Sequence, residues 1–337
     1  MKTVSIYKIT IVLLIIPLLT LSSCSNNTSN HGSKSGLYFD TVVSVDIYGV
    51  SDKDAGQILD ECMSICDKYE KLFNKNITTS DIAKINSSGG QSVHVDHDTV
   101  ELIDNALYYC KSSNGLFDIT IDPVSSLWDF HGDNNTVPDS TTLNRACSHV
   151  DYRNITIDEA NDTITLADPE SSIDIGAAAK GFIADKIAEY LLQYKITGAI
   201  INMGGDMRLI GTKPDNSLFN IGINDPENGG SCIMSLYISD MSVATSGTYE
   251  RCFTSGGKTY HHILDPATGY STKTDIRSVT VITNSSLASD CLCTVSILKG
   301  SDEAYSMIEQ LPDTEAVFIL NDGSVIKTPG ANKYIRN

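Results

Sequence analysis

An acidic residue, a lysine and a run of small residues stand close together in the stretch DIGAAAKGFIAD, residues 174–185. The stretch joins an expected strand to an expected helix, and the exposed backbone N–H groups of a helix N-terminus attract anions. Its glycine and alanines let a ligand approach the backbone closely, while Asp174 and Lys180 place opposite charges at the two ends of the turn. Phosphate is the ligand class that suits such a turn. The alternative is a tight turn into an Ala-rich amphipathic helix that binds nothing.

A second candidate site lies in the segment SSLASDCLCTVSILK, residues 285–299, which has the pattern of a helix. Asp290 and Thr294 are four residues apart, so they share one face of that helix. A carboxylate and a hydroxyl on one face are ligands for a hard divalent cation. The alternative is a hydrogen bond on the protein surface.

Candidate acid/base groups occur in KTYHHILDPATG, residues 258–269, which reads as a strand that runs into an Asp-Pro turn. Neighbouring residues of a strand point to opposite faces, so at most one of His261 and His262 faces a given site. His262 and Asp265 are the candidates for proton transfer. The alternative is a solvated turn.

An aromatic-rich segment, residues 117–128, follows a predicted helix and contains the only tryptophan. It could stack on a flat ring, or it could be a loop that seals the core. The segment NMGGD, residues 202–206, predicts a tight glycine turn between two strands. Neither a Walker lysine loop nor a GxGxxG fingerprint occurs, so the sequence does not indicate a dinucleotide fold of that type.

Hydrophobic periodicity predicts helices and strands in mixed order, which is the pattern of an α+β protein. The expected helices cover residues 52–75, 98–113, from the 174–185 stretch to about 194, and 285–299, with a short helix after Pro138. The expected strands cover residues 37–48, 154–158, 163–167, 198–203, 207–211, 218–223, 233–239, 316–320 and 324–327. The strands at 154–158 and 163–167 are expected to form a hairpin.

The composition indicates a globular, acidic protein. The chain has 337 residues, of which 41% are hydrophobic and 20% charged, and its formal charge is −18. A charge of this sign disfavours nucleic acids and anionic lipid surfaces as partners. Eight cysteines besides Cys24 do not have the spacing of a disulfide scaffold, and several fall on apolar helix faces where a free thiol packs as a small hydrophobe.

The N-terminus has the pattern of an export signal: two lysines, an apolar run from residue 9 to residue 21, and then Leu-Ser-Ser-Cys. This last motif resembles a bacterial lipobox, which implies cleavage after residue 23 and acylation of Cys24. Cleavage would remove Lys2 and Lys8 but no acid, so the formal charge would fall from −18 to −20. We therefore expect a lipoprotein signal peptide at 1–23, a flexible polar tether at 24–36 and a lipid-anchored protein on the extracytoplasmic face of a bacterial cell membrane. A plain secretory peptide or an uncleaved anchor helix is the alternative.

Four stretches in this order, DIGAAAKGFIAD, NMGGD, ATSGTYER with HHILDPATG, and SDCLCT, together resemble the ApbE family of FAD:protein FMN transferases. With FDTVVSV and FDIT…DPVSSLW, the resemblance extends from residue 37 to about residue 300. It implies an α+β, T-fold-like domain over residues 37–337, either as one body or as two closely packed subdomains, with mixed or antiparallel sheets flanked by helices.

The resemblance also implies a reaction. Family members cleave FAD at its pyrophosphate and attach FMN through a phosphoester to a Thr or Ser hydroxyl of an exported acceptor protein, which releases AMP. A divalent cation, Mg²⁺ by expectation, would neutralise the charge on the phosphates. By resemblance its ligands would be the Asp290 carboxylate, the Thr294 hydroxyl and the Ala177 carbonyl, and His262 or Asp265 could assist deprotonation of the acceptor hydroxyl.

FAD would be the substrate, and the resemblance assigns several positions to flavin contact. These are Phe39, Phe73, Phe117, Asp118, Ile119, Asp174, Lys180 and Leu264. The chain departs from the family pattern at Ala177 and Ala178, which replace a glycine and a branched residue, and at Cys293, where some members have an acid. Two other functions stay open: an FAD pyrophosphatase that releases FMN and AMP, and a flavin-binding lipoprotein without catalysis.

Overall fold

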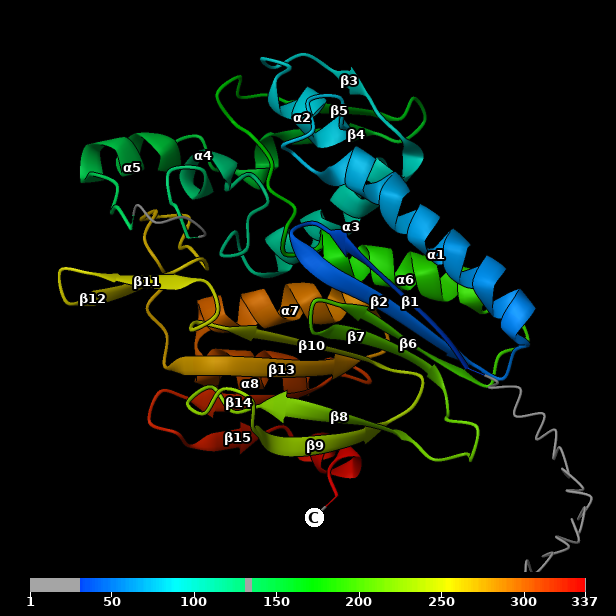
Figure 1. Cartoon of the computed structure of the whole chain (residues 1–337). Helices are drawn as coiled ribbons and strands as arrows, with labels where there is room; N and C mark the ends of the chain where they lie inside the picture. Colours follow the sequence, from blue (N-terminus) through cyan, green and yellow to red (C-terminus); the bar gives the residue numbers. More distant parts are fainter. Residues whose placement is uncertain (1–30, 131–134, 337) are drawn as a thin grey trace, which may run out of the picture.

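The computed structural model describes residues 31–130 and 135–336, and its centre is an eight-stranded antiparallel sheet (Figure 1). The strand order is β1-β2-β6-β7-β10-β13-β14-β15. The strands are β1 (His31–Tyr38), β2 (Thr41–Tyr48), β6 (Gly198–Met203), β7 (Asp206–Gly211), β10 (Ser242–Gly247), β13 (Ile276–Thr283), β14 (Glu315–Leu320) and β15 (Val325–Lys327). The predicted α+β class is confirmed.

Helices cover one face of this sheet. α1 (Asp52–Phe73) packs on β1 and β2, α6 (Ala179–Leu191) on β6 and β7, and α7 (Ser286–Lys299) on β10 and β13. α8 (Ser301–Glu309) packs against α7 and β14, while α3 (His97–Ser112) contacts α7. The predicted helices at 52–75, 98–113 and 285–299 are therefore confirmed to within two residues, because their apolar spacing matches the face that each one buries.

Alternation of side chains along the strands gives the sheet two apolar faces. Ala244, Val281 and Phe318 belong to the large core under the helices, whereas their neighbours Val243 and Ile282 belong to a second core on the opposite face. A separate two-stranded sheet, β8 (Phe219–Asn224) and β9 (Cys232–Ile238), covers that second face. The two strands predicted at 218–223 and 233–239 are thus present, and they form a second layer over the main sheet.

Smaller elements surround this body, and most of them lie in the upper part of Figure 1, whereas the 3₁₀ turn at Pro329–Tyr334 lies at the bottom beside β9 and β14. A three-stranded sheet has the order β3-β5-β4, and β4 and β5 form the predicted hairpin. β11 and β12 form a two-stranded sheet of their own. These elements are α2 (Asp81–Asn86), β3 (Val93–His94), α4 (Asp122–Ser125), α5 (Ser140–Cys147), β4 (Ile155–Asp158), β5 (Thr163–Leu166), β11 (Cys252–Ser255) and β12 (Lys258–His261), with 3₁₀ turns at Tyr152–Asn154 and Pro329–Tyr334.

The N-terminal part of the fold differs from the prediction. Residues 37–48 are not one strand, because Phe39 and Asp40 adopt positive φ angles of 51° and 56° and turn the chain into the β1–β2 hairpin. β1 begins at His31, so residues 31–36 of the expected tether are paired in a strand. Cys24, the expected signal peptide and the first part of the tether lie outside the described residues.

The described residues include every cysteine from Cys62 onwards. All eight cysteines among them are free, and five are buried, as expected for thiols that pack as small hydrophobes. Within residues 31–130 and 135–336, no helix has the length and apolar character needed to span a membrane.

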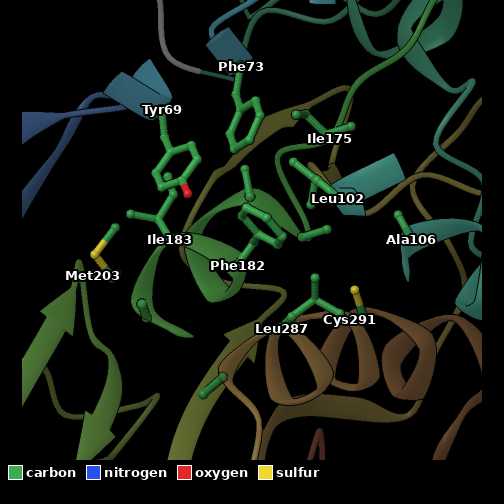
Figure 2. Close-up of a cluster of buried hydrophobic side chains, with 14 of the residues drawn as sticks. Tyr69, Phe73, Leu102, Ala106, Ile175, Phe182, Ile183, Met203, Leu287 and Cys291 are labelled. Atoms are coloured by element: carbon green, nitrogen blue, oxygen red, sulfur yellow. The ribbon is translucent and has the colours of Figure 1, made fainter. Parts of the chain in front are cut away.

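The helix pair α6–α7 is packed unusually closely because of Gly181. A Cβ atom at Gly181 would lie 2.3 Å from the Ser286 carbonyl oxygen. Asp185 of α6 also caps α7: its carboxylate accepts hydrogen bonds from Ser286 N at 2.9 Å and from Leu287 N at 3.0 Å. Figure 2 shows the apolar side of this contact, where Phe182 lies between the Tyr69–Phe73 pair of α1 and Leu287 of α7.

A substitution tests the close approach. Gly181→Ala should lower the free energy of unfolding by about 3 kcal/mol, because the added methyl group meets backbone atoms that cannot move without separating the helices. The control is Gly56→Ala in the exposed part of α1, where a Cβ has no neighbour within 4 Å and should stabilise the helix by about 0.5–1 kcal/mol. Urea unfolding of both variants measures the difference, and equal effects would contradict the packing.

Candidate functional site

A cavity of about 170 Å³ lies between the β1–β2 turn, the end of α1 and the start of α6. Four of the residues predicted to contact flavin border it: Phe39, Phe73, Asp174 and Lys180. The remaining lining residues are Asp40, Asn74, Lys75, Asn76, Ile82, Ile175, Gly176, Ala179 and Arg251. Segments that are far apart in the sequence therefore meet here, and the 174–185 stretch forms one wall.

The two aromatic residues reach the cavity in different ways. Phe39 sits in the β1–β2 turn and is half-buried, so its ring is available at the rim. Phe73 is only 2% exposed, because its ring stacks on Tyr69 at 5.1 Å and meets the edge of Phe182 at 5.8 Å. Phe39 is thus the more accessible of the two for a flat ligand.

Asp174 is held by a lysine that the sequence reasoning missed. Lys75 Nζ lies 2.8 Å from Asp174 Oδ2 and also pairs with Asp122. Gly176 N donates to the other Asp174 oxygen at 3.0 Å. Burial opposes ionisation of Asp174, but Lys75 and these hydrogen bonds hold its pKa below the ordinary value. Lys75 follows the C-terminal end of α1, and nothing in its local sequence relates it to residues 47 and 99 positions away.

Lys180, at the end of the same wall, is also held by two carboxylates. Its ammonium pairs with Asp206 and lies 3.3 Å from Asp290 Oδ1. Burial disfavours the charge of Lys180, yet Asp206 and Asp290 together raise its pKa. Burial also raises the pKa of Asp290 to about 6, although Lys180 acts in the opposite direction. Asp206 closes the predicted glycine turn, which the sequence reasoning treated only as a hairpin.

The three residues predicted as cation ligands lie at or beside the α6–α7 contact. Cys291, next to Asp290 in α7, donates its thiol hydrogen to the Ala177 carbonyl at 3.5 Å. Asp290 Oδ2 accepts from Gly181 N at 3.3 Å, and Thr294 is half-buried one turn further along α7. Asp290 and the segment that begins with Ala177 are therefore directly linked across the interface.

The chemistry of this donor set fits a hard cation. Among the described residues, no three side chains of His, Cys, Asp or Glu are grouped as a metal site. A cation here would therefore need the mixture of carboxylate, hydroxyl and carbonyl oxygens that Mg²⁺ accepts. The Ala177 carbonyl is engaged by a thiol, which is a weak donor.

Acidic side chains outnumber basic ones around the cavity, and Asp40 and Asp174 are among its lining residues. Lys75, Lys180 and Arg251 line it, and the two lysines pair with four carboxylates, those of Asp122, Asp174, Asp206 and Asp290. A diphosphate would add more negative charge to this set. A divalent cation is the kind of group that would restore the balance.

The two acid/base candidates differ in availability. The Asp265 carboxylate accepts from Ala267 N and from Thr268 Oγ1, so it stabilises its own turn. Nδ1 of His262 is buried and has no hydrogen-bond partner among the described residues. Burial lowers the pKa of His262 to about 4, and the charges of Arg251 and Lys180, both at the cavity, act in the same direction. Within the described part of the chain, His262 thus has a free ring nitrogen, whereas the Asp265 carboxylate is engaged in its turn, and neither residue lines the cavity.

The other predicted flavin contacts do not border the cavity. Phe117 and Ile119 belong to the large core, and Leu264 packs with Trp128 in a separate aromatic cluster. Asp118 accepts hydrogen bonds from Thr120 N at 2.8 Å and Tyr152 N at 2.9 Å, so its carboxylate fixes two chain segments. Burial nevertheless raises its pKa. The segment connects to the site through Ile119 O, which accepts from Asp174 N at 2.8 Å.

The chain is similar to known proteins of one family. The model of the ApbE family matches residues 39–318. The FAD:protein FMN transferase of Treponema pallidum is 30% identical over 322 residues, which cover 90% of this chain and 88% of the relative. The FAD:protein FMN transferase of Klebsiella pneumoniae is 34% identical over 263 residues, which cover 77% and 81%.

Solved structures agree with these sequence matches. The crystal structure of the ApbE protein of Thermotoga maritima has a TM-score of 0.83 and 28% identity, and the match covers 91% of this chain and 100% of that one. The flavin transferase ApbE of Vibrio cholerae has a TM-score of 0.80 at 22% identity, with 90% and 99% covered, and shows the fold alone.

The contribution of the Lys75 charge to stability can be tested by removing it. In Lys75→Met, Asp122 and Asp174 lose their shared partner, and the free energy of unfolding at pH 7 should fall by about 1–3 kcal/mol. The loss should shrink as the pH falls below about 4, because a protonated Asp174 no longer needs the ammonium. The control is Lys71→Met on the exposed face of α1, which should cost about 0.5 kcal/mol or less. A pH-independent loss in Lys75→Met would contradict the charge argument.

The pKa of His262 predicts a pH dependence of stability. The folded-state pKa of about 4 lies below the ordinary value of 6.5, so the unfolded chain binds more protons between these pH values. The contribution of neutral His262 is therefore complete above pH 6.5 and is lost as the pH falls towards 4, by at most about 3 kcal/mol. Urea unfolding at stepped pH should show a steeper decline for the unmodified chain than for His262→Asn. Parallel declines would mean that His262 is not held neutral.

Proposed function

The chain belongs to the ApbE family, and we propose that it is a flavin transferase that cleaves FAD and passes FMN to an acceptor protein. The observation that carries this proposal is the cavity itself. Its walls combine three cationic side chains with the start of α6, directly beside the buried carboxylate of Asp290. Such a site can bind a diphosphate and stabilise the charge that develops when it is cleaved.

The proposed reaction is a phosphoryl transfer. The oxygen of a Thr or Ser hydroxyl of the acceptor attacks the phosphorus on the FMN side of FAD, and a new P–O bond forms. The bond from that phosphorus to the bridging oxygen breaks, and AMP leaves with the electron pair. The hydroxyl proton is taken up by a base, and we assign this role to His262, whose imidazole is neutral at pH 7 and has a ring nitrogen that no described residue pairs with.

Asp290, Thr294 and the Ala177 carbonyl would hold a Mg²⁺ ion in this proposal. When bound, the ion supplies Lewis-acid neutralisation of the phosphate charge. Lys180 and Arg251 border the cavity and would contact phosphate oxygens directly. Phe39 at the rim would contact a flat ring of the substrate, while Asp174 and Lys75 keep the wall of the cavity in place.

The setting of the reaction follows from the N-terminal motif. We propose that the chain is exported, acylated at Cys24 and held by its lipid on the extracytoplasmic face of a bacterial cell membrane, where its acceptor would be another exported protein. Leu-Ser-Ser-Cys after an apolar run supports this location. β1 begins at His31, so only a few residues would separate the lipid from the folded body.

The proposal is tested by mass spectrometry of an exported Thr-containing acceptor incubated with the chain, FAD and Mg²⁺. We expect a covalent FMN adduct on the acceptor, one AMP per adduct, and loss of both products with a chelator. Asp290→Ala should reduce AMP release at least 100-fold, because the variant lacks the only buried carboxylate predicted to hold the cation.

The matched control is Asp215→Ala, an exposed acid in the loop before β8, which should leave the rate unchanged. AMP release with an unmodified acceptor would indicate a pyrophosphatase instead. Tight FAD binding without any cleavage would indicate a flavin carrier, and would overturn the transferase proposal.

A further inference from the structure

Asp206 is an acidic residue that borders the site without lining the cavity. Its contact with the cavity runs through Lys180, whose ammonium it pairs with. Lys180 also lies 3.3 Å from Asp290 Oδ1, so one ammonium is shared between two carboxylates. Only one of these carboxylates, Asp290, is a candidate cation ligand.

The fold fixes the position of Asp206. It begins β7 directly after Gly204 and Gly205, whose φ angles of 71° and 110° suit glycine and turn the chain sharply. Thr245 N of β10 donates to Asp206 Oδ1 at 3.1 Å, which ties the carboxylate to the sheet. The side chain is 16% exposed. Its second oxygen, Oδ2, is the one that pairs with Lys180.

This arrangement controls a competition for Asp290. A divalent cation and the Lys180 ammonium are both attracted to the same carboxylate, and two positive charges cannot occupy that position together. The second oxygen of Asp290 already accepts from Gly181 N at 3.3 Å. Whatever draws Lys180 away from Asp290 therefore favours cation binding. The ammonium lies closer to Asp206 Oδ2 than to Asp290 Oδ1, so Asp206 is its stronger partner.

We propose that Asp206 is a positioning residue that shares the Lys180 ammonium with Asp290 and weakens its hold on Asp290, so that a divalent cation can displace the ammonium from Asp290 while Lys180 stays at the cavity. The inference rests on the proposed function, because it assumes that Asp290 binds a cation. It assigns the glycine turn a purpose beyond joining two strands: the turn places a counter-charge for the lysine of α6.

Metal binding to the purified chain tests this role without reference to turnover. Asp206→Asn keeps an oxygen that can accept from Thr245 N but removes the charge, and Asp206→Ser is made alongside it as a second neutral variant. We expect both to raise the dissociation constant for Mn²⁺, used as a spectroscopic probe for Mg²⁺, about tenfold. Lys180→Met should bind Mn²⁺ within threefold of the unmodified chain.

The decisive comparison is the double variant Asp206→Asn/Lys180→Met. Removal of the competing ammonium should restore the affinity to within threefold of Lys180→Met alone. If the double variant binds as weakly as Asp206→Asn, Asp206 is itself a ligand or a structural support, and the inference is wrong. Unchanged Mn²⁺ binding in both neutral variants would also overturn it.

Controls separate this inference from the proposed function. Asp215→Asn, an exposed acid, should bind Mn²⁺ like the unmodified chain. Thermal melting of every variant shows whether it is folded. If the unmodified chain cleaves FAD but the double variant shows no rescue, only the role of Asp206 fails. If the unmodified chain neither binds Mn²⁺ nor cleaves FAD, the proposed function fails and the inference fails with it.

Discussion

The close contact between α6 and α7 is the constraint on which the site depends. Gly181 has no side chain, so the two backbones approach to a distance that a methyl group would forbid, and Asp185 fixes the start of α7 by accepting its first amide hydrogens. Asp290 lies one turn further along α7 and therefore meets the start of α6, where Gly181 N and Lys180 contact it. The 174–185 stretch thus has two functions: its first half borders the cavity, and its second half positions the helix that carries Asp290.

Electrostatics explain how an acidic chain of formal charge −18 can bind an anion. The positive charge is local and is fixed in place, because each of the two cavity lysines is paired with two carboxylates. A lysine held in this manner loses little further side-chain entropy when a ligand binds, so it offers a preorganised charge. The net charge of the chain affects which partners it attracts over a long range. The ion pairs of Lys75 and Lys180 affect which ligands bind inside the cavity.

The sequence predicted those parts whose signal is local. α1, α3 and α7 have apolar spacing and capping residues, and the α6 segment has a recognisable motif, so helices and several site residues were found. β13 was missed because it is buried on both faces and lacks the alternation that marks a half-exposed strand. β1 was missed because its small polar residues resemble a tether, and only its pairing with β2 reveals it. Lys75 and Asp206 escaped because their partners are remote in sequence.

The site also carries a cost in stability that its function would explain. Burial raises the pKa of Asp290 to about 6. The ionised form of this carboxylate is therefore less stable in the folded protein than in water. A core designed only for stability would place an apolar residue at this position of α7, as it does at the neighbouring Cys291 and Leu292. Lys180 offsets part of the penalty but is itself shared with Asp206. Asp290 is a buried acid that its surroundings neutralise only in part, and it lies beside the cavity. This arrangement is expected of a residue retained for binding rather than for folding.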